Sequence, residues 1–171
     1  VLTGNMAFQG GQLYVNGAST VFLVSNWIED GWADYGGALM VTGGSTVTDD
    51  NTVFLGQSAQ YTGGAIHVDT GSSLDLSATS FQHNTADGNG GALFHDDGGT
   101  LSLSSVSMTS NTSRGSGGAI YAVDITEAVQ IIGSYFVGNT STEGDGGAIA
   151  LSNGPLLTVF NSVFDDNIAS E

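Results

Sequence analysis

Apolar and polar residues alternate in short runs along the whole chain, and glycine-rich segments separate these runs. One residue separates Leu39 from Val41, and one residue separates Leu74 from Leu76. A period of two is typical of β-strands, because successive side chains of a strand point to opposite faces. The pattern therefore predicts an all-β chain made of short strands.

Two sequence tags recur in a fixed phase. The first is Gly-Gly-Ala followed by Leu or Ile, with a degenerate Gly-Gly-Gln-Leu copy. It begins at Gly10, Gly36, Gly63, Gly90, Gly117 and Gly146. The second is Phe-x-x-Asn with its variants, which begins at Leu2, Trp27, Phe54, Phe81, Met108, Phe136 and Phe164. Two independent tags in one phase indicate an internal repeat of about 27 residues.

A unit of this size, with two or three short strands, cannot bury its own apolar face. Stacked copies of the unit bury a continuous core. Parallel strands joined by crossovers adopt the right-handed sense almost without exception. We therefore expect residues 1–171 to form a single right-handed parallel β-helix of about six coils. A propeller is the main alternative, but its blades need about 40 residues each.

The second tag predicts two interior columns. Its first residues form an aromatic and apolar stack, in which Trp27 occupies the same position as the members Phe54, Phe81, Met108, Phe136 and Phe164. Its last residues form a ladder of amides that bond to each other or to turn carbonyls. The ladder members are Asn84, Asn111, Asn139 and Asn167. Asn111 and Asn139 also begin Asn-Thr-Ser glycosylation signals, but a buried ladder makes them inaccessible.

A row of larger side chains is expected on the outer face of the coils. If Leu39 and Val41 point inward, the residue between them points outward. The equivalent residues are Tyr14, Met40, His67, Phe94, Tyr121 and Ala150. A contiguous exposed stripe of this kind is typical of a docking surface for a partner. The alternative is that the row only packs along the solenoid or is covered by a loop.

The charge balance narrows the choice of partners. The chain has 17 Asp and Glu residues against one basic residue, Arg114, and its net charge is −16. Such a charge repels nucleic-acid phosphates and anionic membranes. No run of 18 apolar residues occurs, so membrane insertion is not expected. The chain has no cysteine and therefore no disulfide.

The acidic residues do not form an obvious catalytic set. Adjacent carboxylates occur at Glu29-Asp30, Asp49-Asp50, Asp96-Asp97 and Asp165-Asp166, but these pairs fall at different phases of the repeat. Adjacent residues in a strand also point to opposite faces. We therefore expect these pairs to lie in solvated turns, and we expect no enzyme.

No cofactor or metal site is predicted. We expect His67 outside, His95 inside and His83 within a tag, so the three histidines do not share a phase. Weak Ca²⁺ binding by turn carboxylates stays open. The carboxylates that precede the glycine pairs are Asp34, Asp87, Glu143 and Asp145.

Neither end of the sequence shows an amphipathic helix or a polar run that would cap a solenoid. The first tag begins at Leu2 and the last ends at Asn167, so the chain starts and stops in one phase of the repeat. Uncapped strand edges pair readily with another copy. We expect either a segment of a longer array or a unit that stacks head to tail as a fibre.

Gly-Gly-Ala-Ile/Leu together with Phe-x-x-Asn resembles the repeat signature of the chlamydial polymorphic outer-membrane proteins, and similar repeats occur in bacterial and algal surface proteins. The resemblance covers the whole chain. It implies a surface-exposed β-helix passenger, secreted as an autotransporter and often adhesive. The chain departs from the pattern in its lack of Lys and Cys and in its strongly negative charge.

These observations together predict a non-enzymatic extracellular or cell-surface module with a structural or adhesive role, and with a protein or glycan as its partner. A β-helix that binds or cleaves polysaccharides is the alternative, because it would use the aromatic row and nearby carboxylates. An ice-binding protein is a lesser alternative, because Thr46-Val47-Thr48 stands alone rather than in a threonine ladder.

Overall fold

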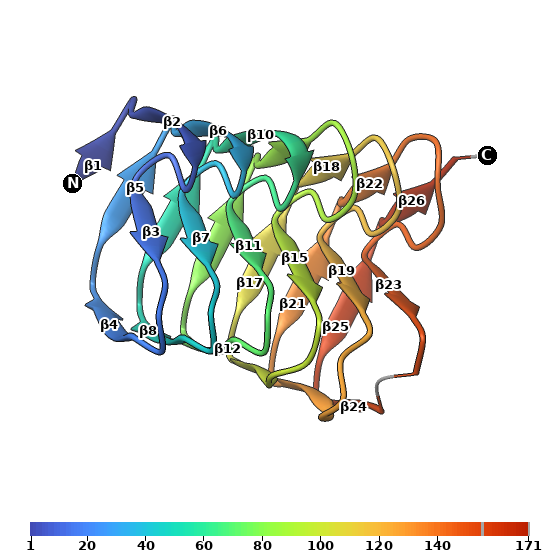
Figure 1. The fold of residues 1–171 in the computed structure, drawn as a ribbon. Helices are drawn as coiled ribbons and strands as arrows, with labels where there is room; N and C mark the ends of the chain where they lie inside the picture. Colours follow the sequence, from blue (N-terminus) through green and yellow to red (C-terminus); the bar gives the residue numbers. More distant parts are fainter. Residues whose placement is uncertain (155, 171) are drawn as a thin grey trace.

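The computed structural model describes residues 1–154 and 156–170. It confirms the predicted all-β parallel solenoid of about six turns, with about 27 residues per turn and no helix in the described part. Figure 1 shows the coils side by side from the N-terminus to the C-terminus. On the near side, β3 (Leu13–Val15), β7 (Leu39–Val41) and β11 (Ile66–Val68) run downward as the chain advances from left to right, which is the right-handed sense.

Each coil contributes four strands, one to each of four parallel sheets, so the expectation of two or three strands per unit is wrong. The missed strand follows the tag asparagine directly. In one coil it is β14 (Thr85–Ala86), which is only two residues long and comes straight after Asn84. A strand of two residues is too short to show alternation of apolar and polar side chains, so the sequence there predicts a turn.

Sheets A and B contain seven strands each. Sheet A consists of β1 (Leu2–Thr3), β5 (Trp27–Glu29), β9 (Val53–Leu55), β13 (Ser80–Gln82), β17 (Ser107–Thr109), β21 (Tyr135–Val137) and β25 (Val163–Asp165). Sheet B consists of β2 (Met6–Gln9), β6 (Trp32–Tyr35), β10 (Ser58–Thr62), β14 (Thr85–Ala86), β18 (Thr112–Ser113), β22 (Thr140–Ser141) and β26 (Ile168–Ala169).

Sheets C and D contain six strands each. Sheet C consists of β3 (Leu13–Val15), β7 (Leu39–Val41), β11 (Ile66–Val68), β15 (Leu93–Asp96), β19 (Ile120–Val123) and β23 (Ile149–Ser152). Sheet D consists of β4 (Thr20–Val24), β8 (Thr46–Asp50), β12 (Ser73–Ser77), β16 (Leu101–Ser104), β20 (Val129–Ile132) and β24 (Leu157–Phe160).

The glycine pair forms the corner between sheets B and C, and its two members have different roles. Gly63 has a φ of +66°, a left-handed conformation that favours glycine. Gly64 has no room for a side chain, because a Cβ there would lie 2.0 Å from the carbonyl oxygen of Gly91 in the next coil. Ala65 follows at 0% exposure and is part of the apolar core.

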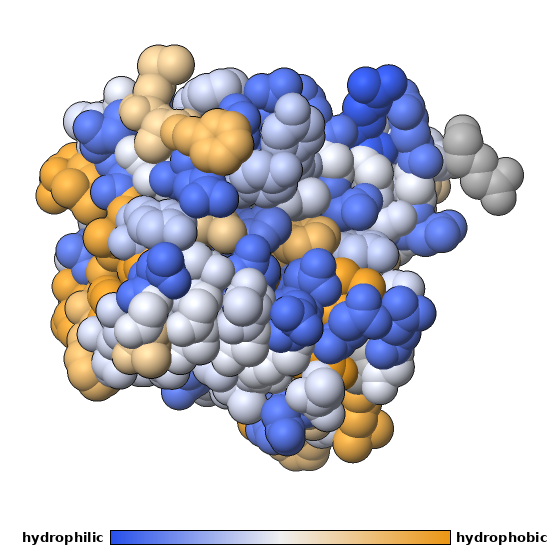
Figure 2. All heavy atoms as spheres, viewed as in Figure 1, coloured by the Kyte–Doolittle hydropathy of each residue, from blue (hydrophilic) through white to orange (hydrophobic). Residues whose placement is uncertain are grey.

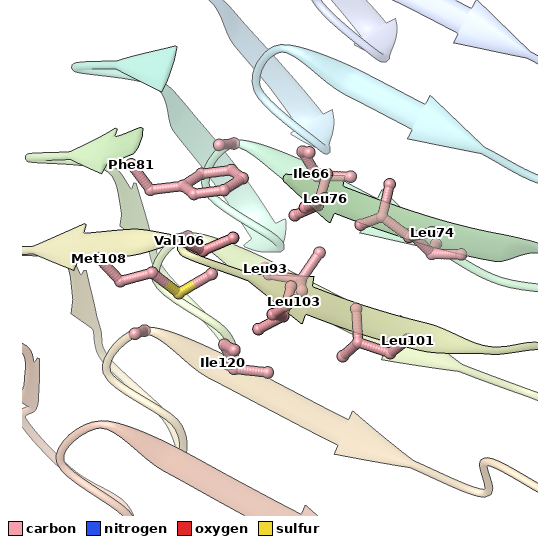
Figure 3. Close-up of a cluster of buried hydrophobic side chains, with 14 of the residues drawn as sticks. Ile66, Leu74, Leu76, Phe81, Leu93, Leu101, Leu103, Val106, Met108 and Ile120 are labelled. Carbon is pink, nitrogen blue, oxygen red and sulfur yellow. The ribbon is translucent and has the colours of Figure 1, made fainter. Parts of the chain in front are cut away.

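The core is a continuous apolar column enclosed by sheets A, C and D. Figure 3 shows Phe81 and Met108 pointing into the same interior as Leu76 and Leu103. Ile66, Leu74, Leu93, Leu101 and Ile120 extend the cluster from coil to coil. Each fully buried side chain of this kind stabilises the fold by roughly 1.5–3 kcal/mol, and only neighbouring coils supply the cover.

The phenylalanines of the second tag stack face to face. The rings of Phe54 and Phe81 have centroids 4.9 Å apart with an angle of 6° between their planes. The rings of Phe136 and Phe164 are 4.7 Å apart at 2°. Met108 lies between these two pairs in register.

The placement of Trp27 in this column is wrong, because the register is shifted by one residue there. Ile28 pairs with Phe54 and is buried, whereas Trp27 pairs with Val53 and points outward. The indole Nε1 of Trp27 instead donates a hydrogen bond to Glu29 Oε2 at 2.6 Å. Since successive strand residues face opposite sides, one residue of slip moves a side chain from the core to the surface.

The tag asparagines form a hydrogen-bonded ladder at the corner between sheets A and B. The Nδ2 groups of Asn84, Asn111 and Asn139 each donate to the Oδ1 of the next asparagine at 2.8–2.9 Å, and Asn167 is the last acceptor. Each Nδ2 also donates to a carbonyl of the preceding coil, such as Asn84 to Phe54 at 3.2 Å. Asn84, Asn111 and Asn139 are completely buried.

Two buried ionisable groups interrupt the apolar core. Asp49 was expected in a solvated turn, but it points inward from β8 in register with Leu23 and Leu76. Burial raises the pKa of Asp49, although hydrogen bonds from Thr52 and Thr79 oppose this effect. His95 is inside as expected, and neither ring nitrogen has a hydrogen-bond partner among the described residues.

The first and last coils are less covered than the middle ones. Leu2 and Phe164 belong to the interior column, yet they are 43% and 44% exposed. A hollow of about 640 Å³ at the last coil is lined by the same kinds of column residues, including Phe164 and Asn167. That the chain is part of a longer array, or stacks head to tail, stays a prediction.

Candidate functional site

The outer row of sheet C is in register through six coils, as its residues pair strand by strand. Tyr14 pairs with Met40, Met40 with His67, His67 with Phe94, Phe94 with Tyr121, and Tyr121 with Ala150. None of these residues belongs to the interior apolar cluster. They therefore lie on the outer face of the sheet, as the alternation predicts.

The expected exposure of this row is wrong for its middle members. Tyr14 is 47% exposed, but Met40, His67 and Phe94 are buried. One cause is stacking along the row: the rings of His67 and Phe94 are 4.8 Å apart at 20°, and those of Phe94 and Tyr121 are 5.6 Å apart at 15°. Each ring thus covers the faces of its neighbours.

A second set of aromatic rings covers the row from the side of sheet B. Tyr35, at the end of β6, meets His67 edge to face at a centroid distance of 5.4 Å. Phe8 and Tyr61 contact Tyr35 at 6.2 Å and 5.1 Å. Together with the stacked row, these residues form an outer aromatic band across several coils.

A shallow groove of about 540 Å³ lies between this band and the turns that follow sheet C. Its floor consists of Met40, His67 and Phe94, one residue from each of three successive coils. Phe8, Gln9, Tyr35 and Thr62 line the sheet B side, and Asp69 and Asp96 line the opposite side. Figure 2 views this face and shows small apolar areas in its middle, surrounded by hydrophilic side chains.

The polar groups of the groove are connected through His67. Its Nδ1 lies 2.7 Å from the hydroxyl oxygen of Thr62, and its Nε2 lies 3.6 Å from Asp69 Oδ2. The contact with His67 lowers the pKa of Asp69 to about 2, so this carboxylate is ionised at neutral pH. Burial, and then the nearby carboxylates of Asp124 and Asp97, raise the pKa of Asp96.

Thr62, His67 and Asp69 form a hydroxyl–imidazole–carboxylate series that resembles a hydrolase triad in composition. Acyl transfer also needs backbone donors aimed at the developing oxyanion. The N–H groups of Gly63 and Gly64, which follow Thr62, donate instead to the carbonyls of Asn89 and Gly90 in the next coil. These two N–H groups are therefore not free to stabilise an oxyanion.

The acidic lining of the groove was not identified from the sequence. Asp69 and Asp96 are not adjacent to each other in the sequence, but each directly follows an inward residue of sheet C, Val68 and His95, which are register partners. They lie 27 residues apart and thus at one phase of the repeat. Comparing carboxylates by repeat phase, rather than by adjacency, would have found them.

The other acidic residues do not converge on the groove. In residues 1–154 and 156–170, no three His, Asp or Glu side chains come together as metal ligands, and weak Ca²⁺ binding stays a prediction. Arg114 pairs with Glu143, with Nε and Oε2 3.0 Å apart, in an exposed loop. Within the described ranges, no helix is long and apolar enough to cross a membrane.

The sequence matches one family model, that of the Chlamydia polymorphic membrane protein (Chlamydia_PMP) repeat, at residues 78–96 and 105–123. The comparisons with curated proteins and with solved structures give no match. The matched segments each run from the second tag toward the end of a sheet C strand, and they include Phe81, Asn84, Met108 and Asn111. The chain is therefore a parallel β-helix in which two segments match the repeat of a family of surface proteins.

Proposed function

We propose that the chain is a non-enzymatic, extracellular adhesive module that docks a partner on the outer face of sheet C. The observation that carries the proposal is the groove over Met40, His67 and Phe94. The interior column over Phe54 and Phe81 holds only apolar side chains, with Leu2, Ile28 and Met108 in register with the phenylalanines. The outer row instead mixes apolar, phenol and imidazole side chains, so the burial of apolar surface alone does not explain its composition.

The surroundings of the groove support a binding role. Rigid aromatic side chains supply contact area at low entropic cost, and neighbouring polar groups supply orientation. Phe8 is 68% exposed at the rim, where it can contact a partner. The polymorphic membrane protein-type repeat supports a position at the cell surface.

The test is adhesion of beads that carry the purified chain to cells. The variant F94S/Y121S removes two rings of the row, and Y135S is the matched control, because Tyr135 is exposed on sheet A. We expect F94S/Y121S to lower bead attachment at least fivefold and Y135S to leave it within about twofold, as expected when contact residues carry most of the binding energy. Equal attachment of the wild type and F94S/Y121S would contradict the proposal.

A polysaccharide ligand is the second candidate, because the groove combines aromatic rings with Asp69 and Asp96. A glycan array with the wild type and D69N/D96N tests binding, and an activity screen on acidic polysaccharides tests cleavage. Turnover that D69N/D96N abolishes would replace the non-enzymatic proposal. Ice binding has less support, since Thr48 pairs with Phe22 and Asp75, although Thr85, Thr112 and Thr140 do stack on sheet B.

A further inference from the structure

The ring orientation in the groove limits what it can hold. His67, Phe94 and Tyr121 stack nearly parallel along the helix axis, so their faces meet each other. A sugar ring packs on an open aromatic face. His67 and Phe94 line the groove, and because their faces meet neighbouring rings they present mainly their edges toward it. The floor is therefore a narrow apolar strip of ring edges and the Met40 side chain, which suits an aliphatic chain better than a flat ring.

One wall of this strip is acidic. Asp69 and Asp96 occupy equivalent positions in adjacent coils, whose stacked strands lie about 4.8 Å apart. Asp69 has one imidazole nearby, that of His67 at 3.6 Å. Asp96 has no basic residue within ion-pair distance among the described residues, and Asp97 and Asp124 add further negative charge around it.

Apart from His67, no basic side chain in residues 1–154 and 156–170 forms an ion pair with this wall. The only basic residue is Arg114, and it pairs with Glu143. A cation near Asp96 would relieve the repulsion among these carboxylates, and partial burial strengthens such an interaction relative to open water. The acidic wall and the apolar floor are thus complementary to a single ligand with a cationic head and an aliphatic stem.

We propose that the groove takes the Lys or Arg side chains of a basic segment of a partner protein. The aliphatic stem lies along Met40 and Phe94, and the cationic head lies between the carboxylates of Asp69 and Asp96. Lys and Arg bury their stems along apolar surfaces in this way and keep the charged group at a polar edge. This inference rests on the proposed docking role of sheet C and names the partner's chemistry.

The experiment is a titration of the ¹⁵N-labelled chain with acetylated, amidated tetra-lysine and tetra-arginine peptides, followed by amide chemical shifts. We expect the shifts to concentrate at residues 67–69 and 94–96. We expect D69N/D96N to weaken binding at least about tenfold, as loss of charge-assisted hydrogen bonds does. The variant D165N/D166N removes the same charge at the last coil, and we expect it to change affinity less than about twofold because salt screens distant charges.

Equal weakening by both double variants, or shifts spread over the whole acidic surface, would overturn the inference. Maltohexaose serves as a neutral glycan probe. If it shifts the amides of 67–69 and 94–96 and tetra-lysine does not, the ligand is a glycan, and the inference fails while docking on sheet C stands. If D69N/D96N does not give the spectrum of a folded protein, F94A replaces it as the test variant. F94A removes part of the groove floor, keeps both carboxylates, and is expected to weaken peptide binding.

Discussion

The inner columns and the outer row of sheet C obey the same stacking geometry but differ in composition. Inside, one column holds only apolar side chains, with Ile28 and Met108 in register with the phenylalanines, and the amides of the asparagine ladder bond to one another. Outside, Tyr14, Met40, His67 and Phe94 succeed one another in the same register. The difference indicates that the coil is built by its interior, which leaves the exterior free to vary from coil to coil.

The largest loss of stability is expected from a substitution in the middle of the inner column. Phe81→Ala removes a completely buried ring that stacks on Phe54, and large-to-small changes of this kind cost about 3–5 kcal/mol of unfolding free energy. Phe164→Ala at the less covered last coil is the control, with about half that loss or less. Urea denaturation measures both. Equal losses would contradict a core whose cover comes from neighbouring coils.

The next largest effect is a dependence of the unfolding free energy on pH, which arises from the buried His95. Burial lowers the pKa of His95 from 6.5 to about 4 in the folded protein. As the pH falls from about 6.5 to about 4, the unfolded chain therefore binds a proton that the folded chain does not. About 3 kcal/mol of stability is lost across that window and the loss levels off below it.

His95→Leu isolates this contribution from that of Asp49, whose raised pKa acts in the opposite sense as the pH falls. We expect the difference in unfolding free energy between the wild type and His95→Leu to change across pH 6.5 to 4. The exposed and non-titrating Gln60, replaced by Ala, is the control and should retain the wild-type dependence on pH. An unchanged difference between wild type and His95→Leu would mean that His95 is accessible to solvent.

A smaller loss is expected from the asparagine ladder. Asn111→Ala leaves the backbone N–H and the Nδ2 of Asn84 without their acceptor, and an unsatisfied buried donor costs about 1–3 kcal/mol. We expect a total loss of about 2 kcal/mol by urea denaturation. The exposed Gln60 is the control, since its change to Ala should stay within about 0.5 kcal/mol. A loss below 0.5 kcal/mol for Asn111→Ala would show that the ladder is hydrated.

The sequence was sufficient for the repeat, the parallel coil, the asparagine ladder and the register of the outer row, because each depends on the phase of a tag. It failed at Trp27, where the tag is degenerate and Ile28 fills the column one residue later. It failed at Asp49, because a carboxylate among apolar columns runs against the usual pattern of burial.

The groove could not be predicted from the sequence for a different reason. Its cover comes from two rings of sheet B: Tyr35, which contacts His67, and Phe8, which contacts Tyr35. The distance between sheets is not encoded in the period of the repeat. The phase of Asp69 and Asp96 was visible in the sequence, but their closeness to the aromatic band was not.

Coil-over-coil register underlies both the core and the groove, and paired cysteines test it most directly, because the natural chain has none. Ser80 and Ser107 are register partners in sheet A, and stacked strands about 4.8 Å apart lie within the Cα separation that a disulfide spans. The account predicts that S80C/S107C closes an intramolecular disulfide under mild oxidation, whereas S80C/S102C, which joins sheets A and D, keeps free thiols. Equal bridging in both variants, or only intermolecular bridging in the first, would contradict it.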